Sequence, residues 1–238
     1  WASVNVSSHT NKYAKIAVIC EVEGKNNMQS PYDFKHIAPT YANEKQPAIF
    51  LLHGMGSNED DLFQLTTAVD GACHIFSLRG PISATPGYAF YLEQEGEPVR
   101  QVFDQVLMHT QKFIFEAIQE YDLDLESIYV MGFNQGAVLA QSLALTMGNT
   151  LAGIVALSGF LPKFVEEEYA KRDVDRMNVF MSHGTYDYVV PFEWAEHAKE
   201  VFEERGANVS FFSYEDGHGV TPQNLEDLSA FLKAQLLH

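Results

Sequence analysis

Short apolar runs that alternate with helical stretches are the feature that most restricts how this chain can fold. The runs are rich in Ile, Val and Phe and are bounded by Gly, Pro, Asn or Asp, as buried parallel strands are. We expect strands at residues 48–52, 74–78, 127–131, 152–157, 178–181 and 208–212. Helices are expected at residues 101–120, 135–147, 191–205 and 224–236. This alternation predicts a single α/β domain with a mostly parallel central sheet and helices on both faces.

The first 27 residues do not share this rhythm. They are polar and irregular apart from a possible short strand at residues 15–20. We expect them to be an N-terminal extension or an edge strand, and Met28 is a possible native start. The α/β domain then runs over residues 28–238, and a run at Tyr32–Ile37 could add an antiparallel edge strand.

Composition excludes several classes of partner. The 238 residues contain 32 acidic and 15 basic side chains, a formal net charge of −17. Nucleic acids and anionic membrane surfaces bind protein surfaces that are rich in Lys and Arg, so we expect neither as a partner. No window approaches the roughly 18 apolar residues of a membrane helix, and Trp1–Thr10 lacks the pattern of a secretory signal. We therefore expect a cytoplasmic protein, which could form a homodimer.

Metal and cofactor signals are weak. The two cysteines, Cys20 and Cys73, are too few for a thiolate metal site or a disulfide framework, so we expect free thiols. Asp60 and Asp61 have no His or Cys at metal-ligand spacing and are expected to be solvated or to brace a loop. We expect no cofactor.

A glycine-flanked turn separates the strand at residues 127–131 from the helix at 135–147. It reads Gly132-Phe133-Asn134-Gln135-Gly136. A Gly-x-Xaa-x-Gly pentapeptide between a strand and a helix is typical of a nucleophile elbow, where a Cβ at either glycine would clash. The central side chain, here Asn134, is then presented at the positive end of a helix.

A second turn follows the strand at residues 48–52. Its glycines would let the N–H of Met55 point at the oxygen of a substrate carbonyl. The N–H of Gln135, next to the elbow, would be the second donor of an oxyanion hole. His53 precedes this turn, so we expect a structural role for it.

Two further candidates follow the last two strands. Asp187 lies after the strand at residues 178–181, and His218 lies after the strand at 208–212. A carboxylate in this position can orient a histidine and stabilise its charged form. The order along the chain is elbow, acid, histidine, which is the order expected of α/β-hydrolases.

These residues together give the chain its resemblance to a known family. It resembles the phospholipase/carboxylesterase branch of the α/β-hydrolases, which includes acyl-protein thioesterases and small bacterial carboxylesterases. The similarity extends over about Tyr32 to His238. The motifs that carry it are Leu51-Leu52-His53-Gly54-Met55-Gly56, Arg79-Gly80-Pro81, Gly132-Phe133-Asn134-Gln135-Gly136, His183-Gly184-Thr185-Tyr186-Asp187 with Val190-Pro191, and Gly217-His218-Gly219.

The resemblance implies a cofactor-free hydrolase of carboxylic esters or thioesters. Asp187 matches the family's acid, His218 its base, and Met55 and Gln135 its oxyanion-hole donors. The family pattern at the elbow is Gly-Phe-Ser-Gln-Gly, however, and this chain has Asn134 where the serine belongs. An amide nitrogen is a poor nucleophile because its lone pair is delocalised, so we expect this chain to be inactive or strongly impaired.

Four explanations for Asn134 remain open at this point. It could be a deliberate substitution that silences the enzyme, or the mark of a natural relative that binds without hydrolysing. It could deamidate to aspartate and supply a carboxylate nucleophile, or the chain could use a different nucleophile. Ser158 follows a neighbouring strand but has no elbow, so we expect a structural role for it.

The segment at residues 81–100 is expected to overhang the site. Its aromatic residues Tyr88, Phe90 and Tyr91 could form an acyl pocket or a lid. Alternatively, they belong to a surface loop and pack on the domain.

Two classes of function compete. The first is an ester or thioester hydrolase that is disabled at Asn134, and the second is a non-catalytic binding protein with the same fold. The Asp187 and His218 pair favours the first, because an abandoned active site need not keep its acid and base. A nucleotide-binding Rossmann enzyme is disfavoured, because the elbow does not give Gly-x-Gly-x-x-Gly.

Overall fold

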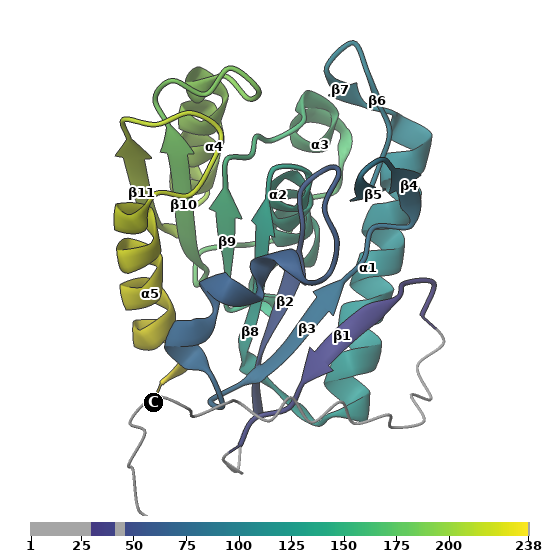
Figure 1. Cartoon of the computed structure of the whole chain (residues 1–238), viewed down its shortest axis with the longest axis vertical. Coiled ribbons are helices and arrows are strands. Elements are labelled where there is room, and N and C mark those ends of the chain that lie inside the picture. The colour runs from purple at the N-terminus through teal and green to yellow at the C-terminus, as the bar shows by residue number, and fades with distance from the viewer. Residues whose placement is uncertain (1–29, 41–45, 238) are drawn as a thin grey trace, which may run out of the picture.

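The computed structural model describes residues 30–40 and 46–237 and shows one layered α/β domain (Figure 1). The possible strand at residues 15–20 lies outside this described part. Seven strands form the central sheet in the order β1-β3-β2-β8-β9-β10-β11. Their bounds are β1 Phe34–Ile37, β2 Gln46–Leu52, β3 His74–Leu78, β8 Leu123–Phe133, β9 Gly153–Leu157, β10 Asn178–Gly184 and β11 Asn208–Tyr214.

The sheet is mostly parallel, as predicted. β1 pairs antiparallel with β3 and forms the expected edge, whereas the other pairs are parallel. Parallel strands that are buried on both faces read as continuous apolar runs, which is why the sequence shows them so clearly.

Helices cover both faces of the sheet. Alternate residues of β2 face opposite sides: Phe50 and Leu52 pack in one core, and Ile49 and Leu51 pack in the other. The first core includes residues of α1 Arg100–Glu120, α2 Gln135–Met147, α3 Lys163–Glu168 and α4 Phe192–Glu204. The second includes residues of α5 Pro222–Leu236 and of two 3-10 helices, Asp61–Leu65 and Thr67–Val69.

The carboxyl ends of β2, β8, β10 and β11 meet at one edge of the sheet, at the top of Figure 1. The turns that follow these strands therefore lie near one another, although they are far apart in sequence. Ligands of open α/β sheets bind at this edge.

Between β3 and α1 the chain forms two small hairpins that the sequence pattern did not predict. They are β4 Ile82–Ala84 with β5 Gly87–Ala89, and β6 Glu93–Gln94 with β7 Glu97–Pro98. In the described residues, none of the helices combines the length and the apolar character that crossing a membrane requires.

Candidate active site

The turn between β8 and α2 has the geometry of an elbow. Its central residue, Asn134, has φ 51° and ψ −116°, a conformation that side-chain-bearing residues rarely adopt. A Cβ on Gly132 would lie 2.0 Å from the carbonyl carbon of Gly136. A Cβ on Gly136 would lie 1.8 Å from the carbonyl oxygen of Leu52. Glycine is therefore required at both flanking positions.

The Asn134 side chain faces the turn that follows β2. Its Oδ1 accepts a hydrogen bond from the backbone N–H of Met55 at 3.3 Å. The backbone N–H of Asn134 donates to the carbonyl oxygen of Leu157 at 3.0 Å. The side-chain amide oxygen therefore occupies the Met55 N–H, which the sequence predicts to bind the oxygen of a substrate carbonyl.

Gln135 is fixed at the start of α2 by a buried side chain. Its Oε1 accepts from the N–H of Phe90 at 3.0 Å, and its Nε2 donates to Glu93 at 3.0 Å. As the first residue of the helix, Gln135 has a backbone N–H without an acceptor within α2. This N–H is directed out of the helix end, as an oxyanion donor requires.

Asp187 and His218 meet directly. His218 Nδ1 lies 2.7 Å from Asp187 Oδ2, and Asp187 Oδ1 accepts from the N–H groups of Val189 and Val190 at 2.8 and 2.9 Å. Burial tends to raise the pKa of Asp187, but the bonds from Val190, His218 and Val189 outweigh it and hold the pKa below its ordinary value. An ionised Asp187 accepts from Nδ1–H, which leaves Nε2 of His218 free for proton transfer.

A second histidine supports the acid from the interior. Nε2 of the buried His183 lies 2.8 Å from the carbonyl oxygen of Val190 and 3.3 Å from Asp187 Oδ2. Both neighbours are acceptors, so Nε2 carries the proton. Burial lowers the pKa of His183, which keeps the ring neutral. The sequence motif included His183, but nothing in the pattern assigned it this contact.

His53 ties two turns together. Its Nε2 accepts from the N–H of Gly80 at 2.9 Å, so Nδ1 carries the proton and donates to the carbonyl oxygen of Gly54 at 2.7 Å. Both ring nitrogens are occupied by backbone groups, which gives His53 the structural role expected of it. Ser158 also lies in the backbone framework, with φ 51° and its N–H bonded to Ser182.

The aromatic residues before α1 pack on the domain, which is the second of the two alternatives. Phe90 and Tyr91 are fully buried in the core, so the structure does not place their rings in an open acyl pocket. Phe90 lies against His53, and Tyr91 packs edge-on against Phe103. Tyr88 is half-buried beneath the guanidinium of Arg79.

An apolar groove lies beside the elbow instead. Its volume is about 430 Å³, and its walls come from the first 3-10 helix, from Phe133 and from the segment that leads into α5. The apolar residues that line it are Leu62, Leu65, Phe133, Val220, Pro222 and Leu225. Phe133 also packs against His218, with ring centroids 5.0 Å apart. The groove therefore opens beside Phe133 of the elbow, whose ring contacts His218, and nothing in the sequence pattern predicted it.

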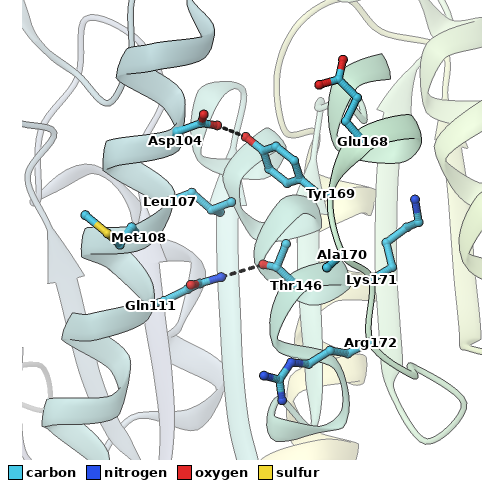
Figure 2. A pocket seen from close by; sticks show the side chains of 10 residues that line it. All are labelled: Asp104, Leu107, Met108, Gln111, Thr146, Glu168, Tyr169, Ala170, Lys171 and Arg172. Carbon is cyan, nitrogen blue, oxygen red and sulfur yellow. Dashed lines mark hydrogen bonds between the residues drawn. The ribbon is translucent and has the colours of Figure 1, made fainter.

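A larger hollow, about 520 Å³, lies between α1, α2 and the segment after α3 (Figure 2). Its walls carry hydrogen bonds from Tyr169 to Asp104 and from Gln111 to Thr146. It contains none of the elbow, acid or histidine residues. Among the described residues, no three His, Cys, Asp or Glu side chains are placed to hold a metal ion.

The sheet, the elbow and the loops at its carboxyl edge define an α/β-hydrolase. Within that class, a sequence profile described as phospholipase/carboxylesterase matches residues 35–236. The chain belongs to the phospholipase/carboxylesterase family.

Relatives and solved structures agree with this placement. Acyl-protein thioesterase 1 of Candida albicans is 26% identical over 218 residues, covering 82% of this chain and 94% of the relative. Acyl-protein thioesterase 1 of Saccharomyces cerevisiae is 35% identical over 125 residues, 50% of this chain and 55% of the relative. The crystal structure of a Bacillus cereus carboxylesterase superposes with a TM-score of 0.78 at 26% identity, covering 88% of this chain and 96% of that one.

Proposed function

We propose that this chain is a carboxylic ester or thioester hydrolase of the serine-hydrolase type that Asn134 disables. The observation that carries the proposal is the meeting of three parts at one sheet edge. They are the Asp187–His218 hydrogen bond, the Met55 N–H donor and an elbow whose central residue is Asn134. The hydrogen bonds of Asp187, His218 and Met55 support the proposed roles of acid, base and donor, and Asn134 is the residue that departs from the family pattern.

With serine at position 134, each part has a defined role. The serine oxygen attacks the substrate carbonyl while Nε2 of His218 takes its proton, and Asp187 stabilises the resulting imidazolium. The N–H groups of Met55 and Gln135 bind the oxyanion. His218 then protonates the leaving group and activates the water that hydrolyses the acyl-enzyme.

Asn134 interferes with this sequence in two ways. Its amide nitrogen cannot supply a nucleophilic lone pair, because that pair is delocalised into the carbonyl. Its Oδ1 also accepts from the Met55 N–H, so it competes with the substrate carbonyl for an oxyanion donor. Both effects reduce acyl transfer.

The apolar groove beside Phe133 is proposed to receive the acyl chain. Leu62 and Leu65 are buried and Leu225 is half-buried, and all three face a groove that begins next to the elbow. An acyl chain in this groove would remove its own apolar surface and that of the lining from water.

The experiment is a paired assay with short-chain and medium-chain aryl esters. It compares the chain as it stands, Asn134→Ser, and Asn134→Ala as a control without a nucleophile, after circular dichroism has established equal folding. We expect Asn134→Ser to exceed both others in kcat/KM by at least about 10³-fold. Equal rates for Asn134→Ser and Asn134→Ala would overturn the proposal.

A non-catalytic binding protein is the second candidate. It is favoured by the combination of an intact groove with an amide at the position of attack. If folded Asn134→Ser is inert but medium-chain fatty acids bind the unchanged chain with micromolar affinity, binding is the better description.

A further inference from the structure

We propose that Asn134 is a self-modification site, at which the fold converts the asparagine to aspartate through a cyclic imide formed with the backbone nitrogen of Gln135. The inference uses the roles proposed above for Met55 and His218 and adds a covalent reaction of the protein with itself. It rests on the backbone angle of Asn134, on the free helix-end N–H and on the Met55 contact.

The backbone angle of Asn134 already suits ring closure. Around the Cα–C bond of an L-residue, Cβ lies about 120° from the backbone nitrogen on the negative side. At the observed ψ of −116°, the nitrogen of Gln135 therefore nearly eclipses Cβ of Asn134. In the five-membered imide ring these two atoms are the ones that Cγ joins, and the backbone C and Cα of Asn134 complete the ring. The elbow thus holds four of the five ring atoms close to the positions that they have in the imide.

Two asparagines in strands lack this arrangement. Asn178 and Asn208 begin β10 and β11, and parallel strands have ψ of about +115°. At such angles Cβ and the next backbone nitrogen lie far from eclipsed. Asn178 and Asn208 therefore serve as internal controls within the same molecule.

The attacking nitrogen is available. Gln135 is the first residue of α2, so its N–H is not held by a helical hydrogen bond. The positive end of the helix favours negative charge that develops at this nitrogen or at the neighbouring oxygen.

The electrophile is activated by a contact that the structure already contains. The Met55 N–H donates to Oδ1 of Asn134 at 3.3 Å. When a nucleophile adds to Cγ, Oδ1 becomes the oxyanion, and the same donor stabilises it. The oxyanion hole would therefore act on the side chain of the protein itself.

The reaction balances with water as the co-reactant. The Gln135 nitrogen gives its proton to Nε2 of His218 and bonds to Cγ of Asn134, while the carbonyl electron pair moves to Oδ1. The carbonyl then re-forms, the Cγ–Nδ2 bond breaks, and His218 returns the proton so that ammonia leaves. Water opens the imide at Cγ and restores the peptide bond with aspartate at position 134. The net change is asparagine plus water to aspartate plus ammonia.

The test follows residue 134 by peptide mass mapping after the folded full-length chain has been incubated in heavy-oxygen water at neutral pH. We expect heavy oxygen to enter residue 134 at least about tenfold faster than Asn178 or Asn208. We also expect urea-unfolded chain to lose this advantage, because unfolding removes the fixed ψ and the Met55 contact.

A His218→Gln variant provides the matched control, since it retains a polar side chain but not the base. We expect it to slow labelling at residue 134 and to leave Asn178 and Asn208 unchanged. Labelling at residue 134 that is no faster in the folded chain than in the unfolded chain would overturn the inference, whatever the variant does.

The two proposals can fail separately. If Asn134→Ser hydrolyses esters but the unchanged chain never takes up label, the self-modification is wrong and the hydrolase scaffold stands. If label enters residue 134 but Asn134→Ser is inert towards esters, the proposed function is wrong and the modification stands.

Discussion

At the scale of single residues, the elbow depends on the absence of a Cβ atom at its two flanking glycines. The Cβ that alanine would add at Gly136 falls within bonding distance of a backbone oxygen, at 1.8 Å from Leu52. Neither β2 nor α2 can move away cheaply, because both are buried in the core. Asn134 has a positive φ but a ψ of −116°, outside the left-handed helical region that asparagine tolerates, so the surrounding packing holds it in this conformation.

We therefore expect Gly136→Ala to lower the free energy of unfolding by about 3 kcal/mol or more through overpacking. Gly96→Ala is the matched control. Unlike Gly136, Gly96 has a positive φ, +82°, but no atom lies within 4 Å of its Cβ position, so only about 1 kcal/mol of backbone strain and no steric overlap is expected there. Urea unfolding measures both values. Equal losses would show that the close approach at Gly136 is not what requires glycine.

At the scale of elements, the sequence pattern predicted the buried strands and long helices well. It predicted the short helix and the hairpin strands poorly. The run at residues 74–78 matches β3, and the helix at 135–147 matches α2, because a buried strand and a long buried helix leave continuous patterns. α3 has six residues and the hairpin strands two or three, too few for a period to show. The groove was not predictable either, because Leu65 and Leu225 come from segments that only the fold brings together.

The edge strand β1 is joined to β3 by a histidine pair. Nε2 of His36 lies 2.8 Å from Nδ1 of His74, and the ring of Tyr121 packs against both. Burial and the neighbouring His74 lower the pKa of His36 from 6.5 to about 4. Burial also lowers the pKa of His74. Two charged imidazoles at this distance would repel each other, so the pair is neutral at pH 7.

The pH dependence of stability follows from the lowered pKa of His36. Between pH 6.5 and about 4 the unfolded chain binds a proton that folded His36 does not, so stability is greatest above pH 6.5 and falls as the pH falls towards 4. Because His36 is half-buried, we expect a loss of about 2 kcal/mol from this residue. Urea unfolding at pH 7.5 and 5 measures the loss. His36→Gln should lose clearly less stability than the unchanged chain over the same range, and an equal loss would contradict this account.

At the scale of the whole molecule, the candidate site lies where the two cores approach each other at the sheet edge. α2 packs in the first core, whereas Phe133, just before the elbow, packs against the second core and lines the groove. The second core also includes α5 and the 3-10 helices. The groove thus lies between the 3-10 helix after β2 and the start of α5, on the same side of the sheet as α5.

This placement predicts how substrate length can be altered. In the Asn134→Ser background, Leu225→Trp should fill part of the groove and lower kcat/KM for medium-chain esters by about tenfold, with little change for acetate esters. Met108→Trp is the control, because Met108 is exposed on α1 at the larger hollow, which lies between α1, α2 and the segment after α3 (Figure 2). A Leu225→Trp variant with an unchanged chain-length profile would place the acyl chain elsewhere.

The presence of asparagine at the elbow has a consequence for how the activity could change by mutation. Two of the serine codons differ from the asparagine codons by a single base, and the serine side chain is smaller than the asparagine side chain that the turn already holds. On the proposed function, hydrolysis and its absence are then neighbouring genotypes, separated by one substitution that needs no compensating change in the fold. A population that carries this gene and faces an ester as its carbon source would be expected to gain ester hydrolysis by substitution of serine at codon 134 before any other position.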